Sequence, residues 1–306
     1  MFDFIVKRFF STIVLLWILL TSLFFLLRLA PGGPFDTDRA WPPEIKTNIL
    51  EKYGLNEPLF AQYQNWLSHV VQGDFKDSFQ YLDRSVVSII RDSLPISLKL
   101  GFLALFFIIV IGIPIGAYCA WKQNTPIDQA FLFLSASGIS IPNYLLASIL
   151  ILIFAIHLQI LPAALWDSPS SIILPSIALA VKPLCMVIRL TRASVLETLG
   201  EDYIRTAYAK GVSEFNVLFK HTLKNALIPI VTLLGPLVAN LVTGSFVIEL
   251  IFQIPGMGKH FISSILNRDY PLAMGVAFVY GSILLFSNFA VDLSYFWIDP
   301  RTRRLK

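Results

Sequence analysis

The chain has 306 residues, of which 56% are hydrophobic and 14% charged, and its net charge is +4 at neutral pH. Its mean hydropathy is strongly positive. A water-soluble domain of this size could not bury so much apolar surface, so these values exclude that class and place most of the chain in lipid.

Six apolar stretches predict six membrane-spanning helices. A helix needs about 20 apolar residues to cross the hydrocarbon, because lipid offers no partners to open backbone groups. The stretches are residues 9–29, 98–121, 130–156, 172–190, 227–252 and 273–298. The first follows Lys7 and Arg8 but is longer than a signal-peptide core and lacks a small-residue cleavage site, so we expect it to stay uncleaved. The fold class is therefore an all-α integral membrane protein.

The segments outside these spans suggest a division of the chain. We expect an N-terminal tail with the first span (1–30), an extracytoplasmic insert (31–97), a five-helix core (98–298) with a cytoplasmic loop (191–226), and a basic tail (299–306). In the insert, apolar residues recur at helical spacing over 45–53 and 60–71, and turn residues separate these runs. A small helical insert is expected.

The basic residues near span ends predict the orientation. With the N-terminus inside, the cytoplasmic side collects thirteen Lys and Arg residues, whereas the two short outside loops carry Lys259 and Arg268 alone. The insert has nine acidic and six basic residues, and a segment of this length hardly affects topology. Both termini are expected to be cytoplasmic.

The sequence has no recognisable catalytic, nucleotide or metal motif. The run from Pro255 to His260 resembles a phosphate-binding loop, but Gln253 stands where its first Gly belongs and His260 where Ser or Thr would meet the metal. The two cysteines, Cys119 and Cys185, have neither a disulfide framework nor a zinc spacing. We expect a non-enzymatic chain that binds no cofactor or metal.

Three ionisable side chains fall within spans: Lys182, Glu249 and Asp292. A charge at mid-bilayer costs at least about 2.5 to 3.5 kcal/mol, so such residues are functional candidates. Glu249 and Asp292 lie near span ends and could instead reach the interface, whereas Lys182, beside Pro183, lies deeper.

Helix-breaking residues indicate where spans bend or pack closely. Span three is interrupted at 140–143 and span five at 235–236 and 244–245; breaks at this depth are tolerated only in protein-lined or watery places. In span two, Gly112 and Gly116 have a spacing that allows close helix approach. The predicted pathway candidates are Lys182, Asn240, Thr243, Ser245 and Glu249.

The longest cytoplasmic loop predicts two short helices at an angle. Glu201 and Asp202 suit a helix start, Gly211 ends that helix, and Ser213 can cap the next one. The second helix carries an apolar stripe of Phe215, Leu218 and Phe219. Such a pair could simply lie on the lipid surface.

This loop also resembles a known motif. Arg205-Thr206-Ala207, Gly211, Leu223 and Pro229 are similar to the EAA loop of ABC importer permeases, in the form of the peptide-importing branch. Arg205 replaces the Glu of the general motif and Lys224 replaces a Pro, and both departures favour that branch. The resemblance covers nearly the whole chain, with similar segments at 29–32, 53–58, 62–63, 73–74, 244–249, 255–258, 267–271 and 299–301. Lys76 departs from an expected Gly.

The resemblance implies a type I ABC importer permease in a bacterial cytoplasmic membrane. Such a subunit forms half of a translocation pathway and couples it to separate ATPases, which hold ATP and Mg. The implied partners are a second homologous permease, two ATPases, an extracytoplasmic binding protein, a peptide and membrane lipid, with no nucleic acid. The implied coupling residues are Arg205, Thr206, Ala207, Lys210, Gly211, Phe215, His221, Asn225 and Pro229.

The substrate and the energy source leave alternatives open. An oligopeptide is expected, but a dipeptide, glutathione or nickel importer of the same family would look alike. A self-sufficient secondary carrier or channel is the rival from another class, although midspan carboxylates are few and inverted repeats are not apparent. Uptake by this chain alone, driven by an ion gradient, would favour that rival.

Overall fold

The computed structural model describes residues 2–35, 43–242 and 246–298. Over these residues the fold is helical, with an isolated β-bridge between Asp77 and Ser85. Five helical stretches are long and apolar enough to span a membrane, and a bent pair makes up to six. The stretches comprise α1 (Phe2–Leu29); α4 (Val86–Phe107), η1 (Ile108–Gly112) and α5 (Ile113–Trp121); η3 (Pro169–Ile172) and α8 (Ile173–Leu199); α12 (Ile228–Val242) and α13 (Phe246–Ile251); and α15 (Tyr270–Ile298).

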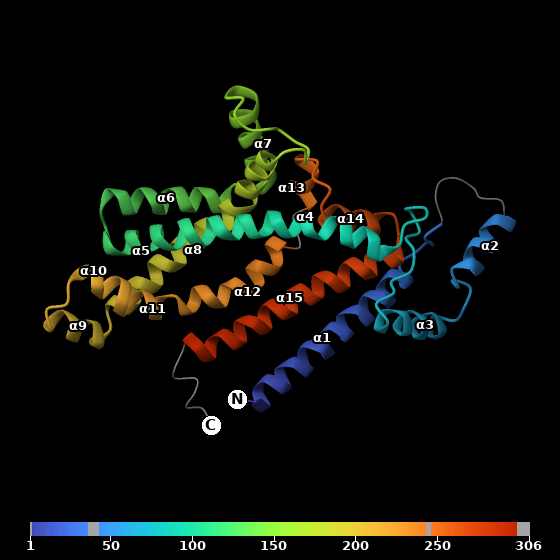
Figure 1. Ribbon diagram of the computed structural model, residues 1–306, viewed down its shortest axis with the longest axis horizontal. Helices are drawn as coiled ribbons and strands as arrows, with labels where there is room; N and C mark the ends of the chain where they lie inside the picture. The colour runs from blue at the N-terminus through green and yellow to red at the C-terminus, as the bar shows by residue number, and fades with distance from the viewer. Residues whose placement is uncertain (1, 36–42, 243–245, 299–306) are drawn as a thin grey trace.

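The third predicted span is the bent pair. Its two parts are α6 (Pro126–Ser140) and α7 (Asn143–Leu150), which continues into η2 (Ile151–His157), and they meet at 107°. Ile141 and Pro142 have extended backbone conformations at the break, because a residue before proline is disfavoured in the helical region. In Figure 1, α7 turns away from α6, and it packs against α8 and α13.

The helix that contains the second predicted span begins at Val86, before the apolar stretch that starts at residue 98. Helix α4 starts at Val86, where the Ser85 side chain accepts a hydrogen bond from the Ser88 backbone N–H. The continuous helix from Val86 to Trp121 has 36 residues and is about 54 Å long, well beyond the roughly 30 Å of hydrocarbon. The last twelve residues of the predicted insert are therefore its first turns.

Helix α8 is the centre of the fold. It packs against α4, α5, α6, α7 and α12, and twelve of its 27 residues are buried. At Gly116 an added Cβ would lie 2.6 Å from the Ile188 carbonyl oxygen and 2.6 Å from Thr191 Cβ. The close approach predicted from Gly112 and Gly116 is thus confirmed.

Helices α12, α15 and α1 form a second group beside this bundle (Figure 1). An added Cβ at Gly235 of α12 would lie 2.7 Å from Asn288 Oδ1 of α15, so these two helices also pack closely. Arg8 of α1 forms an ion pair with Asp292 of α15 at 2.5 Å. Asp292, which the sequence marked as an intramembrane charge, is thereby neutralised within the chain.

The segment predicted to be an extracytoplasmic insert is bonded to the spans. It contains α2 (Pro43–Lys52) and α3 (Leu59–Val71), which lie at one end of the molecule (Figure 1). The Tyr63 hydroxyl accepts a hydrogen bond from Trp17 Nε1 of α1, and Asp269, which is fully buried just before α15, accepts bonds from Ser78 Oγ and the Phe79 N–H. The insert is therefore bonded to two of the spans.

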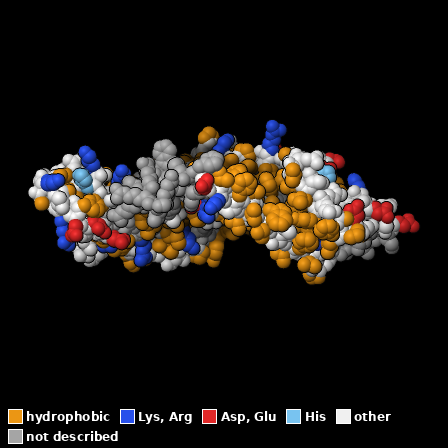
Figure 2. Space-filling view, turned by 90° about the horizontal axis from the view of Figure 1, so that it is seen from below, with side chains coloured by type: hydrophobic (Ala, Val, Ile, Leu, Met, Phe, Trp, Pro, Cys, Tyr) orange, Lys and Arg blue, Asp and Glu red, His pale blue; other side chains and the backbone are white. Residues whose placement is uncertain are grey.

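Charge separates along the long axis of the molecule. Figure 2 shows hydrophobic side chains over much of the middle and charged side chains gathered mostly toward the two ends. One end holds α2 and α3, and the other holds α9 (Asp202–Ala209), α10 (Glu214–Asn216), η4 (Val217–Thr222) and α11 (Leu223–Ala226). This distribution suits a protein embedded across a lipid layer.

Candidate functional site

The loop of residues 191–226, predicted to be cytoplasmic, contains two helical segments that meet at Gly211. Helix α9 ends at Ala209, and Gly211 has a φ of +76°, the left-handed conformation predicted for it. The Val212 N–H donates to the Ala207 carbonyl at 3.2 Å and closes the end of α9. The second segment runs through α10, η4 and α11, and includes an unpredicted π-helical stretch. Ser213 occupies its N-cap position, but its side chain makes no capping hydrogen bond.

One side of the loop packs against the spans and is hydrogen-bonded to them. Ile204, Ala207 and Val217 form a buried cluster that joins the two loop segments. Leu218 packs with Ala117 of α5 and Val195 of α8 and is buried, so the predicted apolar stripe is split between the inside and the outside. Trp121 Nε1, at the end of α5, donates to Glu214 at 3.3 Å. The loop is therefore in direct contact with α5 and α8.

The other side of the loop is exposed. The exposed rings of Phe215 and Phe219, one turn apart, have their centroids 4.5 Å from each other and their planes tilted by 37°. Arg205 pairs with Asp202 at 3.6 Å, and both side chains are largely in solvent. The predicted coupling residues on this surface are Arg205, Thr206, Lys210, Gly211 and Phe215.

The remaining predicted coupling residues lie deeper or at the base of the loop. Ala207 is buried, and Pro229 is exposed in the first turn of α12. Asn225 Nδ2 donates to the Tyr203 hydroxyl at 2.7 Å, and that hydroxyl approaches the His221 carbonyl oxygen at 3.5 Å. Tyr203, which the sequence analysis missed, thus ties α9 to α11.

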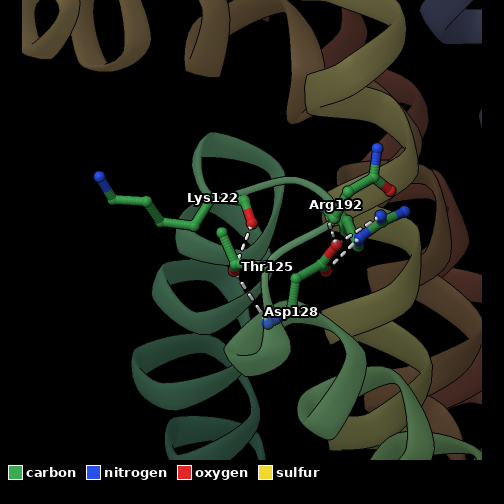
Figure 3. A network of polar contacts seen from close by, with 5 residues as sticks. Lys122, Thr125, Asp128 and Arg192 are labelled. Carbon is green, nitrogen blue, oxygen red and sulfur yellow. Dashed lines mark hydrogen bonds and ion pairs between the residues drawn. The ribbon is translucent and has the colours of Figure 1, made fainter.

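A buried ion pair beside the loop was also missed. Arg192 of α8 binds Asp128 of α6 through two hydrogen bonds, from Nε at 2.6 Å and from Nη2 at 2.8 Å (Figure 3). Asp128 is 1% exposed, and it also accepts the Asn124 N–H at 2.9 Å. The Thr125 hydroxyl accepts the Asp128 N–H, which forms the Thr-x-x-Asp cap that could have revealed this helix start. The pair fixes the α5–α6 turn to α8.

The predicted pathway residues are not gathered into one site. Lys182 is exposed on α8, and Asn240 is exposed on α12, where it lines a cavity of about 420 Å³ with residues of α1, α14 (Met257–Leu266) and α15. Thr243 and Ser245 lie outside the described residues. Glu249 lies apart from both, fully buried.

The Glu249 carboxylate caps the N-terminus of α14. It accepts hydrogen bonds from Ser97 Oγ at 2.9 Å and from the Lys259 N–H at 3.1 Å, while Ser97 Oγ accepts the Met257 N–H at 2.8 Å. An added Cβ at Gly256 would lie 2.5 Å from Glu249 Cδ. A carboxylate is favourable here because a helix N-terminus presents free N–H groups and positive potential. Glycine beside Glu249 is therefore a packing requirement, and the run from Pro255 has a structural explanation.

Two family models cover most of the chain. The model described as "Binding-protein-dependent transport system inner membrane component" matches residues 112–304, and that described as "Binding-prot-dependent transport system membrane comp, N-term" matches residues 1–101. The chain belongs to this family of transport-system membrane components. It is a multi-pass inner-membrane transport subunit.

Full-length relatives agree with this family. The chain is 43% identical over 300 residues to "Dipeptide transport system permease protein DppB" of Bacillus subtilis, covering 98% of this chain and 97% of the relative. It is 42% identical over 305 residues to "Oligopeptide transport system permease protein OppB" of Haemophilus influenzae and 40% identical to OppB of Escherichia coli. Both OppB alignments cover 99% of this chain and all of the relative.

Proposed function

We propose that this chain is the permease subunit of an ATP-driven oligopeptide importer. It would form half of a translocation pathway with a second homologous permease, and it would receive movement from two separate ATPases. An extracytoplasmic binding protein would deliver the peptide. A dipeptide importer has relatives of similar identity and is the second candidate.

The observation that carries the proposal is the two-sided cytoplasmic loop. Its outer side offers paired aromatic rings, Phe215 and Phe219, with the cations of Arg205 and Lys210 nearby in the sequence. Its inner side is packed on α5 and α8. We propose that the outer side docks on an ATPase, where aromatic rings supply contact area and the cations meet acidic or carbonyl groups. Closure of the ATPases would then move the spans as rigid bodies.

The remaining assignments belong to the same proposal. Both termini and the loop would lie in the cytoplasm, with the insert outside, where it would receive the binding protein. ATP and Mg would be bound by the partner subunits, and this chain would hold no cofactor. Lys182, Asn240, Thr243, Ser245 and Glu249 stay predictions as pathway residues.

Reconstitution tests this function. The chain is placed in proteoliposomes with its second permease, ATPases and binding protein, and uptake of a labelled hexapeptide and a labelled dipeptide is measured. We expect hexapeptide uptake that requires ATP and the binding protein. Excess unlabelled dipeptide should inhibit this uptake only weakly. Dipeptide-specific uptake would favour the second candidate. Uptake by this chain alone, driven by an ion gradient without ATP, would overturn the proposal.

A further inference from the structure

Helix α8 has one exposed face and is otherwise packed into the protein. The exposed residues within its 27 residues are Lys182, Met186, Arg189, Ala193 and Glu197. Their spacing of three and four residues places them on a single stripe. The other faces of α8 meet α4, α5, α6, α7 and α12. The exposed surface of this central helix is thus a single stripe that carries three charged side chains.

Lys182 lies near the middle of this span. It is ten residues, or about 15 Å, from Arg192, which binds the α5–α6 turn at the end nearer the loop. In the other direction it lies thirteen residues from Pro169, where the stretch begins. Lys182 is thus close to the midpoint of the helical stretch, and a charge at mid-bilayer is the least tolerated by lipid.

Nothing in the described residues neutralises Lys182. Over residues 2–35, 43–242 and 246–298 it has no carboxylate within ion-pair distance. The acidic residue on its own stripe, Glu197, lies fifteen residues away, or about 22 Å along the helix. An exposed midspan cation is expected to face a watery path or an anionic partner, because lipid satisfies neither its hydration nor its charge.

We propose that Lys182 binds the carboxylate of the peptide as it crosses the membrane, an inference that rests on the proposed function. A free C-terminal carboxylate is common to peptides of every sequence, whereas their side chains vary. Met186, one turn away on the same stripe, suits such variation because its flexible thioether adapts to different apolar groups. Arg189 places a second cation about 10 Å further toward the loop, where the carboxylate can move next.

The test compares one hexapeptide with a free C-terminus and the same hexapeptide with a C-terminal amide. Uptake of each is measured in proteoliposomes holding the complete importer, with wild type, Lys182→Met, Lys182→Arg and, as the matched control, Lys122→Met in the exposed α5–α6 turn. We expect Lys182→Met to slow uptake of the acid about tenfold and to leave the amide within twofold of wild type. Lys182→Arg should keep most acid uptake, and Lys122→Met should change neither peptide.

Other outcomes would overturn the inference. An equal loss for both peptides would make Lys182 structural, and loss of the second permease from purified Lys182→Met complexes would assign Lys182 to a carboxylate of that subunit. If the wild-type importer does not carry the amide, a hexapeptide whose last residue is photoreactive is used instead. Cross-linking of this residue to the α8 fragment that contains Met186 is then compared between wild type and Lys182→Met. Equal cross-linking in the two would overturn the inference. Wild-type complexes without ATP-dependent uptake of the acid would instead contradict the proposed function.

Discussion

Glu249 shows how a single buried carboxylate connects three segments. It lies on α13, accepts a hydrogen bond from Ser97 of α4 and caps the first turn of α14. Its surroundings leave no room for a side chain at Gly256. Removal of the carboxylate leaves buried donors without an acceptor, which is more costly than the loss of an exposed hydrogen bond.

We therefore predict that Glu249→Ala lowers the free energy of unfolding by about 3 kcal/mol, because at least two buried donors lose their partner. Gly256→Ala should be destabilising as well, since its Cβ would overlap the carboxylate. Apparent melting temperatures of the detergent-solubilised protein check both, with exposed Glu197→Ala as control. Equal melting of Glu249→Ala and the control would show that the cap contributes nothing.

The Asp128–Arg192 pair permits a second prediction. Removing one partner of a buried pair leaves an uncompensated charge at a cost of about 3 to 5 kcal/mol, whereas exposed pairs are worth about 0 to 1 kcal/mol. Asp128→Asn should thus destabilise far more than Asp202→Asn in the exposed pair with Arg205. The double variant Asp128→Leu, Arg192→Met should recover part of the loss. If the loss of stability in this double variant equals the sum of the losses in Asp128→Leu alone and Arg192→Met alone, the two charges are not directly coupled.

For single residues, the sequence indicated which side chains are unusual, such as a charge within a span, but not which atoms they contact. It singled out Glu249 as a charge within a span, but the chain turns back between Phe252 and Gly256, and hydropathy does not show which amides then meet the carboxylate. Arg192 entered only as one of thirteen basic residues on one side. Its bond to Asp128 joins residues 64 positions apart, and no local pattern reports such a contact.

The chain reversal in the loop was predictable because it depends on one glycine, whereas the predicted capping hydrogen bond of Ser213 is not formed. Gly211 was expected to take a conformation that L side chains avoid, and its φ is +76° with open space around it. The start of α4 was less predictable, since Arg91 and Asp92 lower the hydropathy of its first turns while Ser85 still caps the helix. Hydropathy detects the membrane-embedded part of a helix and not its projection beyond the lipid.

Backbone conformation at Gly211 makes a prediction for coupling. Gly211→Val should cut peptide uptake and peptide-stimulated ATP hydrolysis at least severalfold, because a β-branched residue enters the left-handed region at a cost of about 1 to 2 kcal/mol or more. Gly211→Asn is the matched control, since Asn tolerates this conformation and no atoms crowd the site. Both variants should insert and assemble normally. Full activity of Gly211→Val would show that the angle between the loop segments is unimportant.

The hydrogen bonds between the insert and the spans decide which variants can test docking of the binding protein. Because Tyr63 bonds to α1 and Ser78 to the start of α15, a large deletion within 36–83 would remove contacts that the spans need. Changes at exposed positions such as Asp74 and Asp83 are the better probes of binding-protein docking. Charge reversal at both should weaken peptide delivery without releasing the ATPases from the purified complex, and release of the ATPases would contradict a docking role.

For the whole molecule, the hydropathy pattern predicted apolar spans with a polar insert and a polar loop outside them, and the structure adds how these parts are joined. The loop is packed on α5 and α8 at one end, and the insert is bonded to α1 and α15 at the other. The continuous helix of α4, η1 and α5 runs between the two ends, and α4 contacts α15 (Figure 1). A force on the loop therefore has a continuous path through packed helices toward the outer surface.

A reversible cross-link from the loop to an ATPase tests this coupling most directly. Ser213→Cys offers an exposed thiol, whereas Ala207 is buried, as are the native Cys119 and Cys185. In the assembled importer, oxidation with cysteines introduced along the ATPase cleft should join the two chains and stop both peptide uptake and ATP hydrolysis, and reduction should restore both. A loop cysteine that never joins an ATPase, or a cross-linked importer that still transports, would contradict the role of this chain as the coupled permease.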